Sequence, residues 1–143
     1  RYTEAIDGRK LDSLVVSPVL DSEFSRMTIT CSGDPATLDQ IIKQLFKLID
    51  VVRGVMDNLP AGHGFITDQL RRAASSIVLN FSEGFGKTTP RDRRRFFMIA
   101  RGSAHEVAAA VDVARAFGVV DQAVTARVAD LCDHLSAMLY RFR

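Results

Sequence analysis

The residues in this sequence best suited to chemistry are arginines gathered between positions 71 and 101. This stretch holds eight basic side chains and two acidic ones, so it carries a formal charge of +6 while the rest of the chain carries −4. Guanidinium groups present forked N–H donors that match the oxygens of phosphate. We therefore predict a nucleic-acid-binding surface, called the basic strip below. Its members are Arg71, Arg72, Lys87, Arg91, Arg93, Arg94, Arg95 and Arg101.

The centre of the basic strip lies where a helix is expected to begin. Pro90 suits the first position of a helix, and Arg91, Arg94 and Arg95 then share one face of its first turns. The helix dipole opposes cations at this end, so the arginines conflict with local stability, as functional residues often do. Phosphate contacts would explain the conflict. A solvated face, or pairing with carboxylates of another subunit, is the open alternative.

Aromatic side chains are scarce, which bears on the kind of nucleic acid that the basic strip would bind. The chain has no Trp and only two Tyr among 143 residues. Base stacking by single-stranded nucleic acid requires aromatic rings interleaved with the basic side chains. We therefore expect contacts with phosphates rather than stacked bases.

A second set of polar residues is expected between helices. Asn80 and Glu83 are one helical turn apart, and so are Ser103 and Glu106. Paired carboxylates can serve acid–base chemistry or a two-metal site, but neither glutamate begins a Glu-x-x-His pattern. A buried glutamate needs a partner, which an arginine of the basic strip could supply. We predict that these four residues form a structural hydrogen-bonded network.

The histidines and cysteines have no metal-binding spacing. Cys31 and Cys132 lie far apart, and His105 lacks a second histidine four residues later, where Ala109 stands. We predict no catalytic residue, no metal and no cofactor. Free thiols are typical of reducing compartments, so a cytoplasmic location is expected. No apolar run approaches the roughly 18–20 residues of a membrane span, so no membrane contact is expected.

Four amphipathic segments are predicted to position these residues. Apolar residues recur at helical spacing over residues 36–58, 66–84 and 90–117, and again in a fourth segment that follows Asp121. Asp34 followed by Pro35, and Thr89 followed by Pro90, are start signals, with Asp92 placed as a capping-box partner. Thr67 or Asp68 could cap the second helix.

The connections between these segments are short, which predicts the architecture. Amphipathic helices joined by roughly two to eight residues pack as antiparallel neighbours. We predict an all-α fold, an antiparallel up-down four-helix bundle. The second and third helices are rich in small residues that let backbones approach, so they are expected to form the closest pair. These residues are Ala73, Ala74, Ser75, Ser76, Ala100, Gly102, Ser103, Ala104 and Ala108.

The first 33 residues have a different pattern. A β-like run begins at residue 11, and Met27, Ile29 and Cys31 alternate with polar residues, as in a half-buried strand. We predict a β-hairpin over about residues 11–31. Two strands alone are marginal in water, so the hairpin must pack on something or pair with another chain. The predicted domains are an N-terminal segment, residues 1–33, and the bundle, residues 34–143.

The bundle segment resembles a known family. The stretches are LPAGHGF at 59–65, DQLRRAASSI at 68–77, NFSEG at 80–84, RRF at 94–96 and ARGSAHE at 100–106. They resemble the four-helix-bundle proteins encoded by intervening sequences in bacterial ribosomal RNA genes. The resemblance covers about residues 59–143 and places 36–58 as the first helix. It implies a homopentamer with a nucleic-acid role that is poorly defined.

The front of the chain resembles a different family. LDSLVV at 11–16, SRMTIT at 25–30 and QIIKQLFKLIDVV at 40–52 are similar to the ACT domain of the acetolactate synthase regulatory subunit. The match covers about residues 9–53. That family's first strand, glycine turn and first helix, which build its valine site, have no counterpart here. We infer a chimera in which an ACT-like hairpin and helix continue into the bundle.

Together these observations predict a non-enzymatic, homo-oligomeric bundle, with a pentamer favoured by the resemblance. Its basic strip is expected to bind RNA or another polyanion. One alternative is an assembly module in which the arginines form salt bridges between subunits or with a protein partner. The other is a remnant ACT segment that senses an amino acid.

Overall fold

A computed structural model describes residues 13–16, 27–30 and 35–142 of the chain. Four α-helices account for most of this part: α1 (Pro35–Asn58), α2 (Gly64–Phe85), α3 (Pro90–Ala116) and α4 (Gln122–Arg141). The bounds of α1, α2 and α3 agree with the sequence prediction within two residues, and α4 begins directly after Asp121, as predicted. Among the described residues, no helix is long and apolar enough to cross a membrane.

The start of α2 differs from the prediction. The helix begins at Gly64, with His63 at the N-cap position and no side-chain hydrogen bond to the first turn. Thr67 and Asp68 therefore lie inside the helix and do not cap it. Gly62, whose φ of +92° suits glycine, lies in the turn between α1 and α2, two residues before the helix begins.

The starts of α3 and α4 were predicted correctly. The Asp92 backbone N–H donates to Thr89 Oγ1 at 3.1 Å, and Thr89 Oγ1 donates to Asp92 Oδ2 at 2.6 Å. The Val124 N–H donates to Asp121 Oδ1 at 2.8 Å. Gly118, at φ +74°, follows the end of α3 and reverses the chain into α4.

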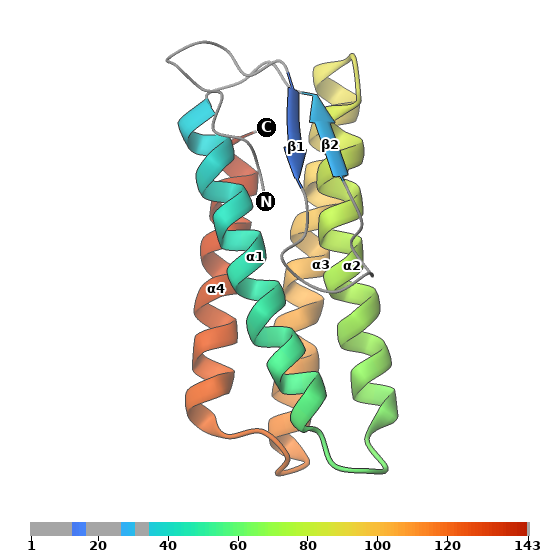
Figure 1. The fold of residues 1–143 in the computed structure, drawn as a ribbon, viewed down its shortest axis with the longest axis vertical. Coiled ribbons are helices and arrows are strands. Elements are labelled where there is room, and N and C mark those ends of the chain that lie inside the picture. The colour runs from blue at the N-terminus through green and yellow to red at the C-terminus, as the bar shows by residue number, and fades with distance from the viewer. Residues whose placement is uncertain (1–12, 17–26, 31–34, 143) are drawn as a thin grey trace.

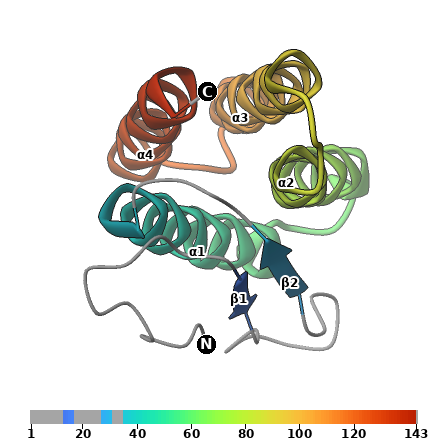
Figure 2. The same ribbon diagram turned by 90° about the horizontal axis from the view of Figure 1, so that it is seen from above.

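The helices alternate in direction, as the short connections predict (Figure 1). Seen along their axes they surround a common core, and each lies beside the helices that precede and follow it, with α4 beside α1 (Figure 2). The most extensive helix contact among the described elements is between α2 and α3, as their small residues predict, and α1 packs more closely on α4 than on α2. The four-helix bundle is thereby confirmed.

An aromatic cluster fills one end of the core. The rings of Phe81, Phe85 and Phe97 contact one another with centroids 4.7 to 5.7 Å apart, and Phe142 packs on Phe85. Gly84 lies so close to this cluster that an added Cβ would come within 2.6 Å of the Phe97 ring. The ends of α2 and α4 are therefore fixed against the first turns of α3.

Two short strands precede the bundle. β1 (Ser13–Val16) pairs antiparallel with β2 (Met27–Thr30), with Ser13 opposite Thr30 and Val16 opposite Met27, and β2 lies against α2. The predicted hairpin spans residues 11–31, and its connection, residues 17–26, falls outside the described residues. The hairpin as an appendage, and the division at residue 33, therefore stay predictions.

Candidate nucleic-acid interface

The centre of the basic strip is three arginines in the first two turns of α3. Arg91, Arg94 and Arg95 are exposed, and none of them forms an ion pair with any described residue. The one acidic residue of this first turn, Asp92, is hydrogen-bonded to Thr89. The start of α3 thus carries uncompensated positive charge where the helix dipole adds to it, and an anion would relieve that repulsion.

One further residue of the basic strip, Lys87, lies at the turn between α2 and α3. Lys87 Nζ forms an ion pair with Glu83 Oε1 at 2.5 Å and stands 4.8 Å from the centre of the Phe96 ring. Arg95 approaches the same ring, with its Cζ 6.0 Å from the ring centre. Phe96 is therefore an aromatic residue inside the basic strip, beside two of its cations. This corrects the expectation that no aromatic ring is interleaved with them.

Arg93 is turned away from its neighbours in the basic strip. Its Nη2 donates to the backbone oxygen of Lys87 at 3.3 Å, and its Nε is buried with no hydrogen-bond partner in the described structure. Because successive residues on a helix point about 100° apart, Arg93 turns inward where Arg94 is exposed. Arg93 thus holds the turn between α2 and α3, and it is not part of the exposed charge.

Arg71 and Arg72 lie in the other half of the bundle. The hydrogen bond between Ser76 and Ser103 places these two residues level on antiparallel helices. At about 1.5 Å of rise per residue, Arg71 and Arg91 are then about 25 Å apart along the bundle axis. Arg71 also pairs with Asp68 at 3.8 Å. The prediction that all eight residues form one strip is wrong for this pair.

Arg101 is fixed at the seam between α3 and α4. Its Nε donates to Ser136 Oγ at 2.7 Å, and its Cζ lies 5.3 Å from the centre of the Tyr140 ring. Ser136 is only 4% exposed and shares a second hydrogen bond, of 3.2 Å, with His105 Nε2. The sequence pattern did not identify Ser136 or Tyr140, since nothing local relates them to Arg101, 35 or more residues away.

The predicted polar network is smaller than expected and contains a residue that was missed. Asn80 Nδ2 donates to Ser76 Oγ at 3.0 Å, Ser76 and Ser103 share a hydrogen bond of 2.7 Å, and Ser103 Oγ donates to the Ile99 oxygen. Ser76 thus joins Asn80 to Ser103 across α2 and α3. Its place among the small residues of α2 was the available signal, because small residues are expected where helices approach closely.

The two glutamates lie outside this network. Glu83 is exposed and pairs with Lys87, while Glu106 is exposed and has no ion pair in the described part of the chain. Both sit on outer faces of their helices, so water solvates the carboxylates and no buried arginine is needed. Their inclusion in the network was wrong.

Cysteine and histidine form no metal site in the part of the chain that the structure describes, where no group of three or more potential ligands is found. Cys132 is buried, and burial, with a smaller effect from Asp133, raises the pKa of its thiol to about 12. It therefore stays protonated near neutral pH. His63 lies at the far end of the bundle, packed against Phe65 and Phe117. Cys31 is outside the described residues.

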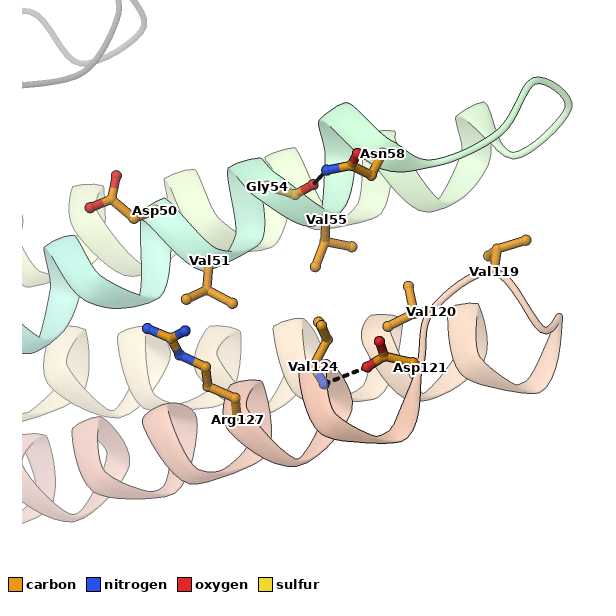
Figure 3. A pocket seen from close by; sticks show the side chains of 10 residues that line it. All are labelled: Asp50, Val51, Gly54, Val55, Asn58, Val119, Val120, Asp121, Val124 and Arg127. Atoms are coloured by element: carbon orange, nitrogen blue, oxygen red, sulfur yellow. Dashed lines mark hydrogen bonds between the residues drawn. The ribbon is translucent and has the colours of Figure 1, made fainter.

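A groove between α1 and α4 was not predicted (Figure 3). It has a volume of about 550 Å³, and valines from both helices, including Val51, Val55 and Val124, line it. Arg127 extends from α4 towards Val51 at one side, and the cap bond of Asp121 lies at the other. The groove is on α1 and α4, away from the arginines at the start of α3.

Comparison with known proteins identifies the bundle. The sequence pattern of a family described as 23S rRNA-intervening sequence protein matches residues 39–141, so the match includes most of α1 as well as α2 to α4. A solved structure of a protein of unknown function from the S23 ribosomal protein family of Bacteroides thetaiotaomicron has a similar fold. Its TM-score is 0.59 at 12% identity, covering 73% of this chain and 95% of that one. Neither description names an enzymatic activity.

A second group of relatives consists of acetolactate synthase small subunits. The isozyme 3 small subunit of Escherichia coli is 52% identical over 46 residues, which is 32% of this chain and 28% of that protein. The probable small subunit of Archaeoglobus fulgidus is 27% identical over 129 residues, or 85% of this chain and 79% of its own length. The chain thus spans little more than a quarter of the Escherichia coli relative.

Proposed function

The chain belongs to the family of 23S rRNA-intervening sequence proteins, and on that premise we propose that it is a non-enzymatic bundle protein that binds RNA or another polyanion. The observation that carries this proposal is the group of exposed arginines at the start of α3. Arg91, Arg94 and Arg95 have no ion pair with the described residues. Arginine side chains so placed can contact phosphates without first breaking a salt bridge.

The binding surface proposed here is narrower than the basic strip. It comprises the three arginines together with Lys87 and Arg101, which flank them towards α2 and α4. Arg71 and Arg72 lie on α2, about 20–25 Å along the bundle axis from the three arginines, and Arg93 is engaged in the turn. The proposal therefore predicts that charge at the start of α3 matters more for binding than the net charge of the protein.

Replacement of Arg91, Arg94 and Arg95 together by alanine tests this prediction. The variant should bind a fluorescent RNA oligomer at least about tenfold more weakly at low salt, and the slope of log affinity against log salt should fall by about 2–3. It should melt no lower than the wild type, because the removed cations oppose the helix dipole. Fluorescence anisotropy at several salt concentrations measures both quantities.

A matched control removes the same charge elsewhere. Arg53, Arg115 and Arg127 are also exposed, and they lie away from the start of α3. Their joint replacement by alanine should leave RNA affinity within about twofold of the wild type at about 0.1 M salt, where charges more than about 10 Å apart are largely screened. Equal RNA binding by the wild type and the Arg91/Arg94/Arg95 variant at low salt would rule the proposal out.

A second candidate function, assembly with further copies of this chain, is supported by exposed apolar side chains. Leu79 on α2 is 65% exposed, and Ile99 and Val113 on α3, together with Phe117 at its C-cap, are exposed as well. Ile99 and Val113 are 14 residues apart, about 21 Å along α3, and the exposed Glu106 lies between them. Exposed apolar side chains contribute to subunit contacts when another chain covers them. The homo-oligomer, with a pentamer favoured, remains a proposal.

Light scattering on the arginine variant separates the two candidates. If the arginines form salt bridges between subunits, the variant should have a lower molar mass than the wild type. If they bind RNA, the molar mass should be unchanged and RNA affinity should fall. An unchanged mass together with unchanged RNA affinity would contradict both roles for these arginines.

We also infer that the chain is a fusion, with an ACT-like segment joined to the bundle. Two similarities support the inference: the short 52% identity to the Escherichia coli small subunit, and the family match over residues 39–141. Because that match begins inside α1, the junction would lie within this helix rather than after it. The ACT-like strands would then be an appendage whose amino-acid site is incomplete.

A further inference from the structure

Aromatic rings occur on both flanks of the exposed arginines of α3. On the side of the α2–α3 turn, the Phe96 ring lies 4.8 Å from Lys87 Nζ and 6.0 Å from Arg95 Cζ. On the side of α4, the Tyr140 ring lies 5.3 Å from Arg101 Cζ and is 44% exposed. A ligand that contacts the arginines would therefore meet an aromatic ring at either edge of α3.

Arg101 is held in place beside its ring. Its Nε is bonded to the buried Ser136 hydroxyl, so the guanidinium lies between α4 and solvent with a defined orientation. Its two Nη groups make no hydrogen bond with the described residues, which leaves them available to phosphate oxygens. Arg101 and Tyr140 thus combine a phosphate donor and a stacking surface within one contact.

The two rings are contributed by different helices. Phe96 is on α3 beside Lys87 at the α2–α3 turn, whereas Tyr140 is on α4 beside Arg101. Phe96 and Arg101 are five residues apart on α3, about 7.5 Å along its axis, so a strand must be several nucleotides long to meet both rings. The arginines between the rings would contact the phosphates of these nucleotides. A duplex offers the rings only its terminal base pairs, because its internal bases are already stacked on both faces.

We propose that this surface takes single-stranded RNA, with bases stacked on Phe96 and Tyr140 and phosphates on the arginines between them. The inference rests on the proposed polyanion-binding function and specifies its ligand. Aromatic–base stacking together with basic side chains is the usual way in which proteins hold single strands without sequence preference. The observation that decides for single strands is the presence of the rings within the charged surface, which duplex or polyphosphate binding would not require.

The test compares two probes that carry the same backbone charge. One is a 12-nucleotide oligoadenylate, and the other is an abasic oligomer of equal length that has the phosphates but no bases. The full chain should bind oligoadenylate more tightly than the abasic oligomer. Tyr140→Leu and Phe96→Leu should each weaken oligoadenylate binding by about tenfold, the loss expected for one stacked base, and should leave affinity for the abasic oligomer unchanged.

A control variant and the alternative outcomes complete the design. Phe117→Leu removes a ring that is more exposed than Tyr140 or Phe96, at the far end of the bundle, and should not change binding. Equal affinity for the two oligomers, or tighter binding of a 12-base-pair duplex, would overturn the single-strand inference while leaving polyanion binding intact. Failure to bind either oligomer at low salt would instead overturn the proposed function itself. Phe96→Leu keeps the test decisive if Tyr140→Leu fails to fold.

Discussion

At the scale of single residues, neighbours in the sequence have different roles because a helix separates them in space. Arg93 is turned inward and donates to the Lys87 oxygen, whereas Arg94 is exposed. Composition and charge counting treat the two alike, and they overestimate the basic surface for that reason. Only basic side chains that the fold leaves exposed and without an ion pair would be available to a polyanion.

Gly84 is the residue whose identity the packing constrains most directly. A Cβ at this position would lie 2.6 Å and 2.7 Å from two carbons of the Phe97 ring, and 3.3 Å from the Arg93 oxygen. Phe97 is fully buried and enclosed by other rings, so it cannot move aside without loss. Glycine is therefore required here for the close approach of α2 to α3, even though its backbone conformation is ordinary.

We predict that Gly84→Ala lowers the free energy of unfolding by about 1–3 kcal/mol, the usual cost of overpacking a core. Gly102→Ala is the matched control: it is also in a helix, but an added Cβ there meets nothing within 4 Å. That change should raise stability by about 0.5–1 kcal/mol. Urea denaturation followed by circular dichroism measures both. If Gly84→Ala stabilises the protein as much as the control does, the close approach is not present.

At the scale of elements, α3 has a strong N-terminal capping signal followed by arginines that the helix dipole disfavours. Thr89 and Asp92 form a reciprocal pair of hydrogen bonds at its N-terminus, and Pro90 presets the first turn. Three exposed arginines follow within five residues and repel the helix dipole. The cap thus offsets the cost of placing positive charge at the start of a helix.

Thr89→Ala should therefore destabilise the protein more than a surface threonine usually does. Loss of an N-cap costs about 1 kcal/mol, which lowers the melting temperature by about 3–5 °C for a chain of this size. Thr88→Ala, one residue earlier and also exposed, is the control and should change the melting temperature by less than about 1 °C. Thermal unfolding at low ionic strength measures the difference. Equal effects of the two changes would indicate that the cap does not stabilise α3.

At the scale of the whole molecule, α1 is the helix that shares sequence similarity with two different groups of proteins. It packs against α4 and contributes to the valine-lined groove, and most of it falls within the family match over residues 39–141. The same residues continue the segment that is similar to acetolactate synthase small subunits, where ACT-like strands precede the helix. A fusion within α1 would require one helix to continue both the ACT-like segment and the bundle. The apolar residues of α1 are buried in the bundle core, as this requires.

The proposed fusion predicts that the chain does not sense valine. A ligand that binds only the folded state stabilises it by about 2.7 kcal/mol at 100 times its dissociation constant. Because the ACT resemblance covers only about residues 9–53, we expect millimolar L-valine to leave the melting temperature unchanged, as should D-valine, the control for nonspecific effects. A melting temperature that rises with L-valine but not with D-valine would favour the amino-acid-sensing alternative. Differential scanning calorimetry provides the measurement.

The sequence by itself determined the four helices, three of the helix starts and the antiparallel order of the bundle. These features depend on local signals: apolar spacing of three and four residues, capping side chains such as Thr89 and Asp121, and short connections. The closest helix pair was also predictable, because small residues mark where backbones approach. The family resemblance followed from local motifs in the same way.

Only the tertiary structure decided which charged residues act together. Arg71 and Arg72 lie far from the start of α3, and Arg93 points into the turn between α2 and α3. Both glutamates of the predicted network are on the surface. The tertiary structure also brought Tyr140 and Ser136 to Arg101, and Phe96 to Lys87. These relations depend on the rotation and register of packed helices, which join residues distant in the chain. Local periodicity predicts which residues of a helix face the core, but it does not predict which side chains of the other helices they contact.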